Sequence, residues 1–471
     1  MSDLPPPPGE PRLPAGPPTR PPTSGTPWTA PGAPPPPSSA PVPQDGGPPP
    51  SRPRWLWTVL AVLAVLTLLA ATVVVVTRDG DGADDGTASV DTTTPLPEQP
   101  GSTSPPEQAP PDPLTEEDLQ ALVDDLQAYV AEARGLDYKR PVVVELAADA
   151  EFEARLLEQF EEDVEEIEEA EVFYRALGLI DAERSLVDEL RAIYSAGVLG
   201  FYDPETNELV VRGTSLTPYV RKTIVHELVH ALDDQHFELF REEYDERDDE
   251  IGTGFSALVE GNARRIEDRW LQDQAAEVRE QAEAEEQAFA AGIDVDDFPE
   301  ILLFEIGAPY ELGEIFVAAL LADGGERAVD AAFGDPPTTS EQVLFPPLYE
   351  SRQARVEVPP PPADGEVVDE GVVGALFWFG LFTTGEAPVA PQDAFQAVQG
   401  WGGDWGVTWE DGDAACARVD VVGDTPDDTA ELEEALKAWA DQSAGAEVSD
   451  VDGRVRVESC VAGAAGANPQ V

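Results

Sequence analysis

The three histidines of this 471-residue chain lie within eleven residues, at His226, His230 and His236. Glu227 follows the first of them, so the segment reads His-Glu-Leu-Val-His. On a helix, positions i and i+4 lie on one face, so His226 and His230 can bind one metal ion. Glu227 lies beside them, where its carboxylate can take a proton from a metal-bound water. The pattern predicts a Zn²⁺ site with His226 and His230 as ligands and Glu227 as the catalytic base.

A simpler interpretation is a buried helix whose histidines only satisfy hydrogen bonds. Histidine is so rare here, with 3 residues in 471, that an accidental motif of this kind is expected in roughly one such chain in several hundred. Apolar neighbours surround the motif, and Glu227 is the one charged residue between Thr223 and Ala231. We therefore favour the metal site.

A zinc site of this class needs a third protein ligand, and two residues compete for that position. His236 follows His230 by six residues, which is the spacing of the metzincins. Metzincins also need a glycine where this chain has Asp233, and a downstream methionine turn. The only methionine here is Met1, so that turn is impossible. Glu260, the one carboxylate of an apolar helical stretch, is the favoured third metal ligand.

A glutamate a few tens of residues after the histidine motif resembles the gluzincins. Many gluzincins carry an aspartate four residues after this glutamate, where it orients a histidine. This chain has Arg264 at that position. Another carboxylate must then support the ligands, and the candidates are Asp233, Asp234 and Asp268.

Further segments extend the resemblance to a group of uncharacterised extracytoplasmic zincin-like proteins of bacteria and archaea. The similar segments are 226–237, 257–263, 309–313, 338–342 and 400–404. The resemblance covers most of residues 114–460 and implies a peptidase with a protein or peptide substrate. It also implies an edge strand that pairs with the substrate backbone, for which Glu208 to Val211 is the candidate. Candidate donors to the developing oxyanion are Tyr202, Tyr310 and Arg264.

Mixed strands and helices without regular βαβ alternation predict an α+β fold for this part of the chain. Thr115 and Asp118 form a capping-box pattern at the start of a helix that ends near Arg134. We also expect a strand over 141–146, a hairpin over 198–211 and a helix over 218–239. A single acidic helix is expected to bury one face made of Phe152, Leu156, Phe160, Val164 and Ile167.

The prolines from Pro359 to Pro362 predict a boundary between a zincin-like domain over 114–358 and a C-terminal α+β unit over 366–462. In that unit a helix over 430–440 lies between two alternating strands that carry Cys416 and Cys460. The strands can bring the two cysteines together, and an oxidising compartment would then favour a disulfide. Two separate buried thiols are the alternative.

The N-terminal quarter of the chain predicts a membrane anchor. Residues 1–54 contain 21 prolines in the first 50 positions, which indicates a disordered tail. Residues 55–77 carry no charge and would span roughly 35 Å as a helix, enough to cross a bilayer. A cleaved signal peptide is the alternative, but it would need a leading region of unusual length. Residues 78–113 read as a flexible linker.

Arginines precede the apolar segment and aspartates follow it, so the positive-inside rule places the N-terminus in the cytoplasm and the catalytic domain outside. The chain has 94 acidic and 28 basic side chains, for a net charge of −66. This charge excludes nucleic acid as a partner and favours solubility. The sequence thus predicts a single-pass, membrane-anchored zinc metallopeptidase. The alternative is an inactive zincin-fold surface protein that binds a partner or acts as a sensor; the oligomeric state is not indicated.

Overall fold

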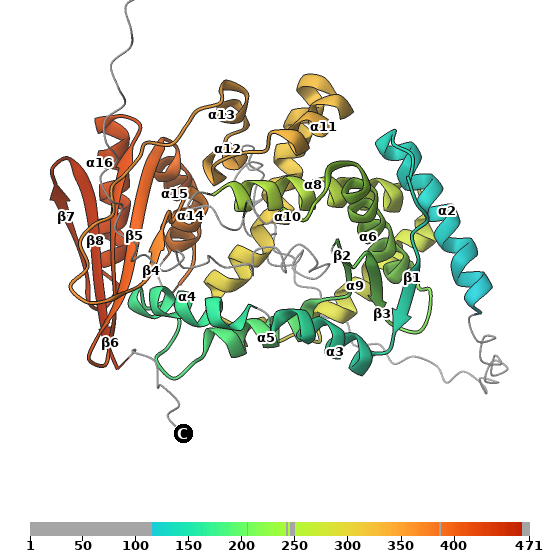
Figure 1. Cartoon of the computed structure of the whole chain (residues 1–471), viewed down its shortest axis with the longest axis horizontal. Coiled ribbons are helices and arrows are strands. Elements are labelled where there is room, and N and C mark those ends of the chain that lie inside the picture. The colour runs from blue at the N-terminus through green and yellow to red at the C-terminus, as the bar shows by residue number, and fades with distance from the viewer. Residues whose placement is uncertain are drawn as a thin grey trace, which may run out of the picture. The chain divides into compact units, whose positions relative to one another are not determined.

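The computed structural model describes residues 115–463, except 162, 205, 242–243, 245–249 and 386–387. The expected tail over 1–54, membrane helix over 55–77 and linker over 78–113 lie outside these residues. No helix within the described part is both long and apolar enough to cross a bilayer. The described chain has an α+β fold with two separate sheets, as the sequence predicted (Figure 1).

The first half of the described chain contains a small sheet and the helices around it. Its elements are α2 (Glu116–Arg134), β1 (Val144–Ala147), α3 (Asp149–Phe160), α4 (Val164–Ala176), α5 (Leu186–Gly197), β2 (Gly200–Asp203), β3 (Glu208–Arg212), α6 (Pro218–Phe237), α8 (Ile251–Gln272) and α9 (Ala276–Ala290). The predicted capping box at the start of α2 is confirmed. The Thr115 hydroxyl accepts the N–H of Asp118 at 3.1 Å, and the Asp118 carboxylate accepts the N–H of Thr115 at 3.3 Å.

The expected acidic helix is in fact two helices, α3 and α4, which are separated after Phe160. Its apolar residues still face the core, since Phe152, Leu156, Phe160 and Ile167 are buried. Residues spaced by four drift around a straight helix by roughly 40° per step. In one continuous helix Val164 would lie roughly 120° around from Phe152. The break after Phe160 instead lets the two helices cover one core from different directions.

The three-stranded sheet has the order β1–β3–β2, with β1 parallel and β2 antiparallel to β3. The hairpin prediction is confirmed, but the expected edge strand is wrong. Glu208 to Val211 belongs to β3, the central strand, and its backbone pairs on both sides. Within the hairpin the strand at a sheet edge is β2, because β1 from far earlier in the chain pairs with the other side of β3 and forms the opposite edge.

The second half of the described chain begins with the short helix η5 (Val295–Asp297) and continues with α10 (Glu300–Gly324), the longest helix among the described residues, which packs across α8. The remaining elements are α11 (Glu326–Gly334), α12 (Ser340–Leu344), α13 (Pro346–Ser351), β4 (Val367–Gly371), α14 (Ala375–Thr383), α15 (Pro391–Val398), β5 (Trp401–Asp411), β6 (Ala414–Gly423), α16 (Pro426–Ala440), β7 (Ala446–Val451) and β8 (Arg454–Ala462). The last five strands form an antiparallel sheet in the order β4–β5–β6–β8–β7.

The two cysteines face each other on neighbouring strands of this sheet. Cys416 on β6 is the register partner of Cys460 on β8, and the two are joined in a disulfide. The predicted pairing is therefore confirmed. The expected helix between these strands is α16, and β7 also lies between them in the sequence.

The similar segments 338–342 and 400–404 meet in a buried polar core at the start of α8. Glu250, which precedes α8, accepts hydrogen bonds from the backbone and hydroxyl of Ser340. Asp404 accepts four N–H groups, from the backbone of Val373 and Gly374 and from the indoles of Trp378 and Trp401. Burial raises the pKa of Glu250 to about 8. This core connects the C-terminal sheet to the helix that carries Glu260.

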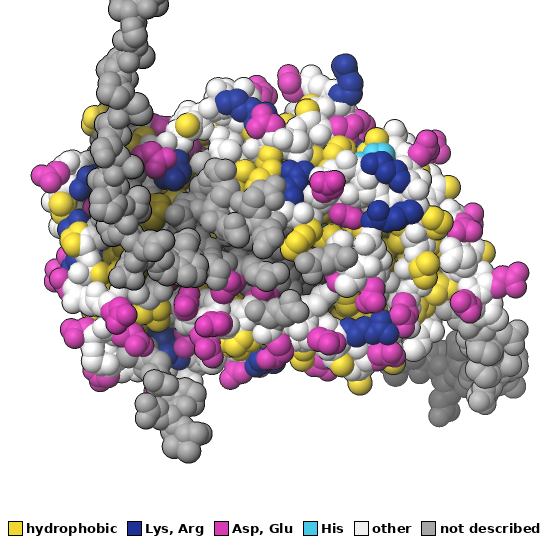
Figure 2. Space-filling view, in the orientation of Figure 1, with side chains coloured by type: hydrophobic (Ala, Val, Ile, Leu, Met, Phe, Trp, Pro, Cys, Tyr) yellow, Lys and Arg dark blue, Asp and Glu magenta, His cyan; other side chains and the backbone are white. Residues whose placement is uncertain are grey.

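Acidic side chains are spread over the face of the molecule that Figure 2 shows. Asp and Glu (magenta) are scattered across this face and outnumber the Lys and Arg side chains (dark blue) among them. A charge spread in this way favours solubility.

Candidate metal centre

The predicted motif lies in the middle of α6. This helix starts at Pro218, where the Thr217 hydroxyl caps it by accepting the N–H of Val220 at 3.3 Å. Apolar residues on the remaining faces of α6 pack into the core, so His226, Glu227 and His230 are all buried. The helix holds both imidazoles on one face, as the spacing predicted.

Glu260 of α8 completes a group of three candidate metal ligands. The two Nε2 atoms of His226 and His230 are 3.0 Å apart, and Glu260 Oε2 lies 3.2 Å from the first and 3.6 Å from the second. Four-coordinate zinc with bonds of about 2.0–2.2 Å separates its ligand atoms by roughly 3.3 Å. The three side chains could therefore hold a metal ion, and no other group of this kind was found among the described residues.

His236, the alternative third ligand, lies apart from this group. Its Nε2 hydrogen bonds to the backbone carbonyl of Asp137 at 2.8 Å. Glu260, rather than His236, is therefore the residue that joins the two histidines. Because α6 continues as a helix to Phe237, and position 236 lies six residues after His230, the two histidines project from different faces of the helix.

Glu267, which the sequence interpretation missed, orients His226. Its Oε2 lies 3.2 Å from His226 Nδ1, the other ring nitrogen, while Nε2 faces His230 and Glu260. Burial alone would raise the pKa of Glu267, but Lys222, His226 and Arg264 outweigh it and hold the pKa at about 2. Glu267 follows Glu260 by two helical turns, so both carboxylates lie on the same face of α8.

None of the three aspartates that were expected to orient a histidine is recorded in contact with His226 or His230, and two of them bind other residues. Asp233 binds Arg134 and Asn262. Asp234 accepts the Tyr202 hydroxyl at 2.7 Å. For Asp268, burial and the neighbouring Glu267 carboxylate raise the pKa to about 6. For His226, the orienting carboxylate is thus Glu267.

Two carboxylate oxygens of the site fit a bound cation. Glu227 Oε2 and Glu260 Oε1 are both buried without a hydrogen-bond partner in the described part of the chain. Buried polar atoms without a partner are costly, and they are rare in folded proteins. Burial raises the pKa of Glu227 to about 7, although the two histidines lower it. Oxygen and imidazole donors converging on one point match the preferences of zinc.

Tyr310 of α10 is the hydroxyl donor beside these groups. Its ring stacks against His226 with centroids 6.1 Å apart, and its hydroxyl hydrogen bonds to Glu260. Burial and the nearby carboxylates of Glu260 and Glu227 raise the pKa of Tyr310 well above its ordinary value. The other candidate donors have partners elsewhere, Tyr202 with Asp234 at 2.7 Å and Arg264 with Glu311 at 3.0 Å.

The edge strand β2 passes directly beside Glu227. A Cβ atom on Gly200 would lie 2.8 Å from Thr223 Cγ2 and 3.2 Å from Glu227 Cγ. The absence of a side chain at position 200 therefore lets the strand approach the base. Comparison with protein-family models, curated proteins and solved structures found no match for this chain.

Proposed function

We propose that this chain is a zinc-dependent metallopeptidase of the zincin type. One observation carries the proposal. His226, His230 and Glu260 place three lone-pair donors within 3.0–3.6 Å of one another, and the buried carboxylate of Glu227 is adjacent to them in the sequence. A helix stabilised only by its apolar packing does not require three such side chains to converge, or two buried carboxylate oxygens beside them without a hydrogen-bond partner among the described residues.

When bound, zinc supplies a Lewis acid that polarises the scissile carbonyl and lowers the pKa of water. Glu227 then serves as the general base that accepts the proton and delivers it to the leaving amine. Its Oε2 is free to do so, because it has no hydrogen-bond partner among the described residues. Glu267 keeps the His226 ring in position from the opposite side.

The substrate backbone is expected to bind along β2. Arg212 N donates to the Leu199 carbonyl at 2.7 Å, which makes these two residues a hydrogen-bonded pair of the antiparallel ladder. By alternation, the backbone groups of Gly200 and Tyr202 point to the unpaired edge of the sheet. An extended peptide can add to that edge as another strand, which places its backbone beside Glu227.

Tyr310 is the residue we propose to stabilise the oxyanion. Its hydroxyl lies at the ligand Glu260 and close to Glu227, where charge develops during attack on the carbonyl. A preorganised donor in a buried site stabilises that charge more than water does.

Anchoring by residues 55–77, with the catalytic domain outside the cell membrane, remains part of the proposal. The disulfide between Cys416 and Cys460 supports it, because disulfides persist in oxidising compartments. A protein of the same fold that only binds a partner is the alternative function. The intact base Glu227 favours the enzyme, since a binding scaffold has no need for an unpaired carboxylate beside its metal ligands.

Metal content and proteolysis of the purified full-length protein test the proposal. We expect one zinc per chain, lost in Glu260→Ala and retained in His236→Ala. Glu227→Gln should keep the zinc and lose cleavage of an unfolded protein substrate. Zinc binding with no cleavage by the native chain, on a broad peptide library, would favour the binding protein. Absence of zinc after reconstitution would refute the metal site.

A further inference from the structure

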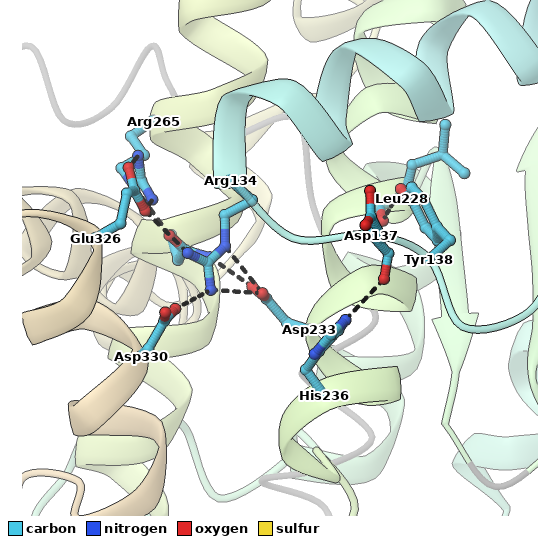
Figure 3. Close-up of polar contacts among 10 residues, drawn as sticks. Arg134, Asp137, Tyr138, Leu228, Asp233, His236, Arg265, Glu326 and Asp330 are labelled. Atoms are coloured by element: carbon cyan, nitrogen blue, oxygen red, sulfur yellow. Dashed lines mark hydrogen bonds and ion pairs between the residues drawn. The ribbon is translucent and has the colours of Figure 1, made fainter.

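Arg134, at the end of α2, is buried within a set of carboxylates from other helices. Its Nε and Nη2 donate to Asp233 Oδ1 at 3.0 and 2.8 Å. Its Nη1 donates to Glu326 at 2.9 Å, and Nη2 also donates to Asp330 at 3.0 Å. Figure 3 shows the guanidinium reaching from α2 between Asp233 and Asp330, with Arg265 and Glu326 on its other side.

These contacts continue into a closed ring of side chains. Asn262 donates to the second oxygen of Asp233. Arg265 Nε donates to Asn262 Oδ1 at 2.9 Å, and the Arg265 guanidinium binds Glu326 through two bonds of 3.0 and 2.7 Å. Since Arg134 binds Glu326 as well, the ring closes. We call Arg134, Asp233, Asn262, Arg265 and Glu326 the Arg134 ring.

The ring joins the two helices that carry the metal ligands, close to the ligands themselves. Asp233 follows His230 by three residues on α6, and Asn262 follows Glu260 by two residues on α8. The Asp233–Asn262 hydrogen bond therefore bridges α6 and α8 about one helical turn from the site. At one end of this bridge, Arg134 of α2 donates to Asp233. At the other end, Arg265 donates to Asn262 and is itself bound by Glu326 of α11.

The pocket around Arg134 suits a planar guanidinium and no other cation. Phe237 and Phe333 stack on each other with centroids 4.6 Å apart, and the Arg134 Cζ lies 5.8 and 5.9 Å from their centroids. The planar guanidinium donates four hydrogen bonds, in directions that its geometry fixes, to the carboxylates of Asp233, Glu326 and Asp330. A lysine would keep the charge but has a single nitrogen for all three partners.

We propose that Arg134 is a positioning residue for the metal ligands. By holding Asp233, it fixes the second half of α6 against α8 and sets the separation of His230 from Glu260. The inference rests on the proposed zinc site, and it adds α2 to the elements that build this site. A metal site requires its ligands to be held within about 0.5 Å, which the ring can supply and surface contacts cannot.

The alternative is that the Arg134 ring only stabilises the fold, so the two roles must be separated by experiment. Removal of one partner from a buried ion network destabilises a protein whatever its function. Zinc affinity of the folded fraction is the measurement that distinguishes them. It is obtained by chelator competition on full-length protein, at a temperature where circular dichroism shows each metal-free variant to be folded.

We expect zinc affinity to fall roughly 10- to 100-fold in Arg134→Met, in the range that loss of a ligand-supporting contact produces. The zinc affinity of Arg134→Lys should lie between that of Arg134→Met and that of the native protein. Val455→Ala is the matched control, because it lowers stability in the core of the C-terminal sheet and touches no residue of the ring. Its zinc affinity should equal that of the native chain.

Folded Arg134→Met with native zinc affinity would overturn the inference and leave the proposed function standing. If Arg134→Met does not fold, Asn262→Ala opens the ring at the bridge itself, and unchanged zinc affinity in that variant would overturn the inference equally. A native chain that binds no zinc would refute the proposed function and the inference together.

Discussion

Gly261 of α8 and Gly313 of α10 lie against each other where the two helices cross. A Cβ on Gly261 would lie 2.0 Å from the carbonyl carbon of Gly313, and a Cβ on Gly313 would lie 2.0 Å from the Ala257 oxygen. The backbones themselves are thus in contact. Gly261 follows the proposed ligand Glu260, and Gly313 follows Tyr310 by three residues, so this crossing brings the tyrosine hydroxyl to Glu260.

A side chain at the crossing should therefore separate the tyrosine from the ligand. We expect Gly261→Ala to destabilise the protein by about 1–3 kcal/mol, as overpacking does, and to reduce cleavage more than zinc content. Thermal unfolding and metal analysis measure the two effects. Gly334→Ala at the end of α11, where a Cβ meets no atom within 4 Å, is the control and should be neutral or slightly stabilising. A fully active Gly261→Ala would contradict the role of the crossing.

Glu267→Gln tests the carboxylate behind His226. The change removes the negative charge that accepts the His226 Nδ1–H and preserves the size of the side chain. We expect zinc affinity to fall roughly 10- to 100-fold. Asp268→Asn, one position later, should leave the affinity near the native value. If Asp268→Asn lowered zinc affinity and Glu267→Gln did not, Asp268, one of the three aspartates that the sequence left open, would be the supporting carboxylate.

Gly200→Ala tests the approach of the edge strand to the base. The new methyl group would lie 2.8 Å from Thr223 Cγ2 and 3.2 Å from Glu227 Oε1, so it should displace the base and leave the metal ligands in place. We expect kcat to fall at least about tenfold with zinc content unchanged. Thr223→Ser removes the nearest methyl group, and in the double variant it should restore part of the loss. Additive losses would argue against a direct contact.

Stability should decline as the pH rises from about 5 to about 7, and Glu305 is one cause. Burial raises its pKa to about 7, although a hydrogen bond of 2.6 Å from the Tyr174 hydroxyl opposes the shift. The folded chain keeps this proton up to about pH 7, whereas the unfolded chain loses it near pH 4.5. The folded state therefore binds more protons in this window, and its stability falls with rising pH.

In Glu305→Gln this contribution disappears. Relative to the native chain, the variant should gain on the order of 2–3 kcal/mol between pH 5 and pH 8. Denaturant unfolding at a series of pH values measures the difference. Glu158→Gln on the exposed face of α3 is the control. Parallel stability curves for native protein and Glu305→Gln would show that Glu305 ionises normally in the fold.

The residues of the site differ in whether a pattern in the neighbouring sequence identifies them. His226, Glu227 and His230 follow from the period of one helix, and Glu260 from a single carboxylate in an apolar stretch. Glu267 carried no such signal, because its role depends on which face of α8 meets α6. The sequence could not separate Tyr310 from Tyr202 and Arg264 as a candidate donor, because only the crossing of α8 and α10 brings Tyr310 to the proposed ligand Glu260.

The edge strand shows the same limit for the fold. A hairpin is a local feature, and the turn between β2 and β3 predicted it correctly. Which of its strands lies at the edge depends on β1, whose partner Leu209 lies 65 positions after Val144. A pattern read along the chain cannot show that pairing. The break between α3 and α4 likewise depends on where the core lies, which the spacing of the apolar residues does not show.

The polar core around Glu250 also limits how the C-terminal unit of this protein could be exchanged for that of another protein. The prolines at 359–362 look like a junction at which two proteins could exchange their C-terminal units. However, Leu376 N donates to the Ser340 hydroxyl at 2.9 Å, and Gly400 N donates to Glu341 at 3.0 Å, so contacts specific to both sides cross that junction. A chimera joined there would leave Glu250 and Glu341 buried opposite foreign residues. The two units must therefore be inherited, or redesigned, together.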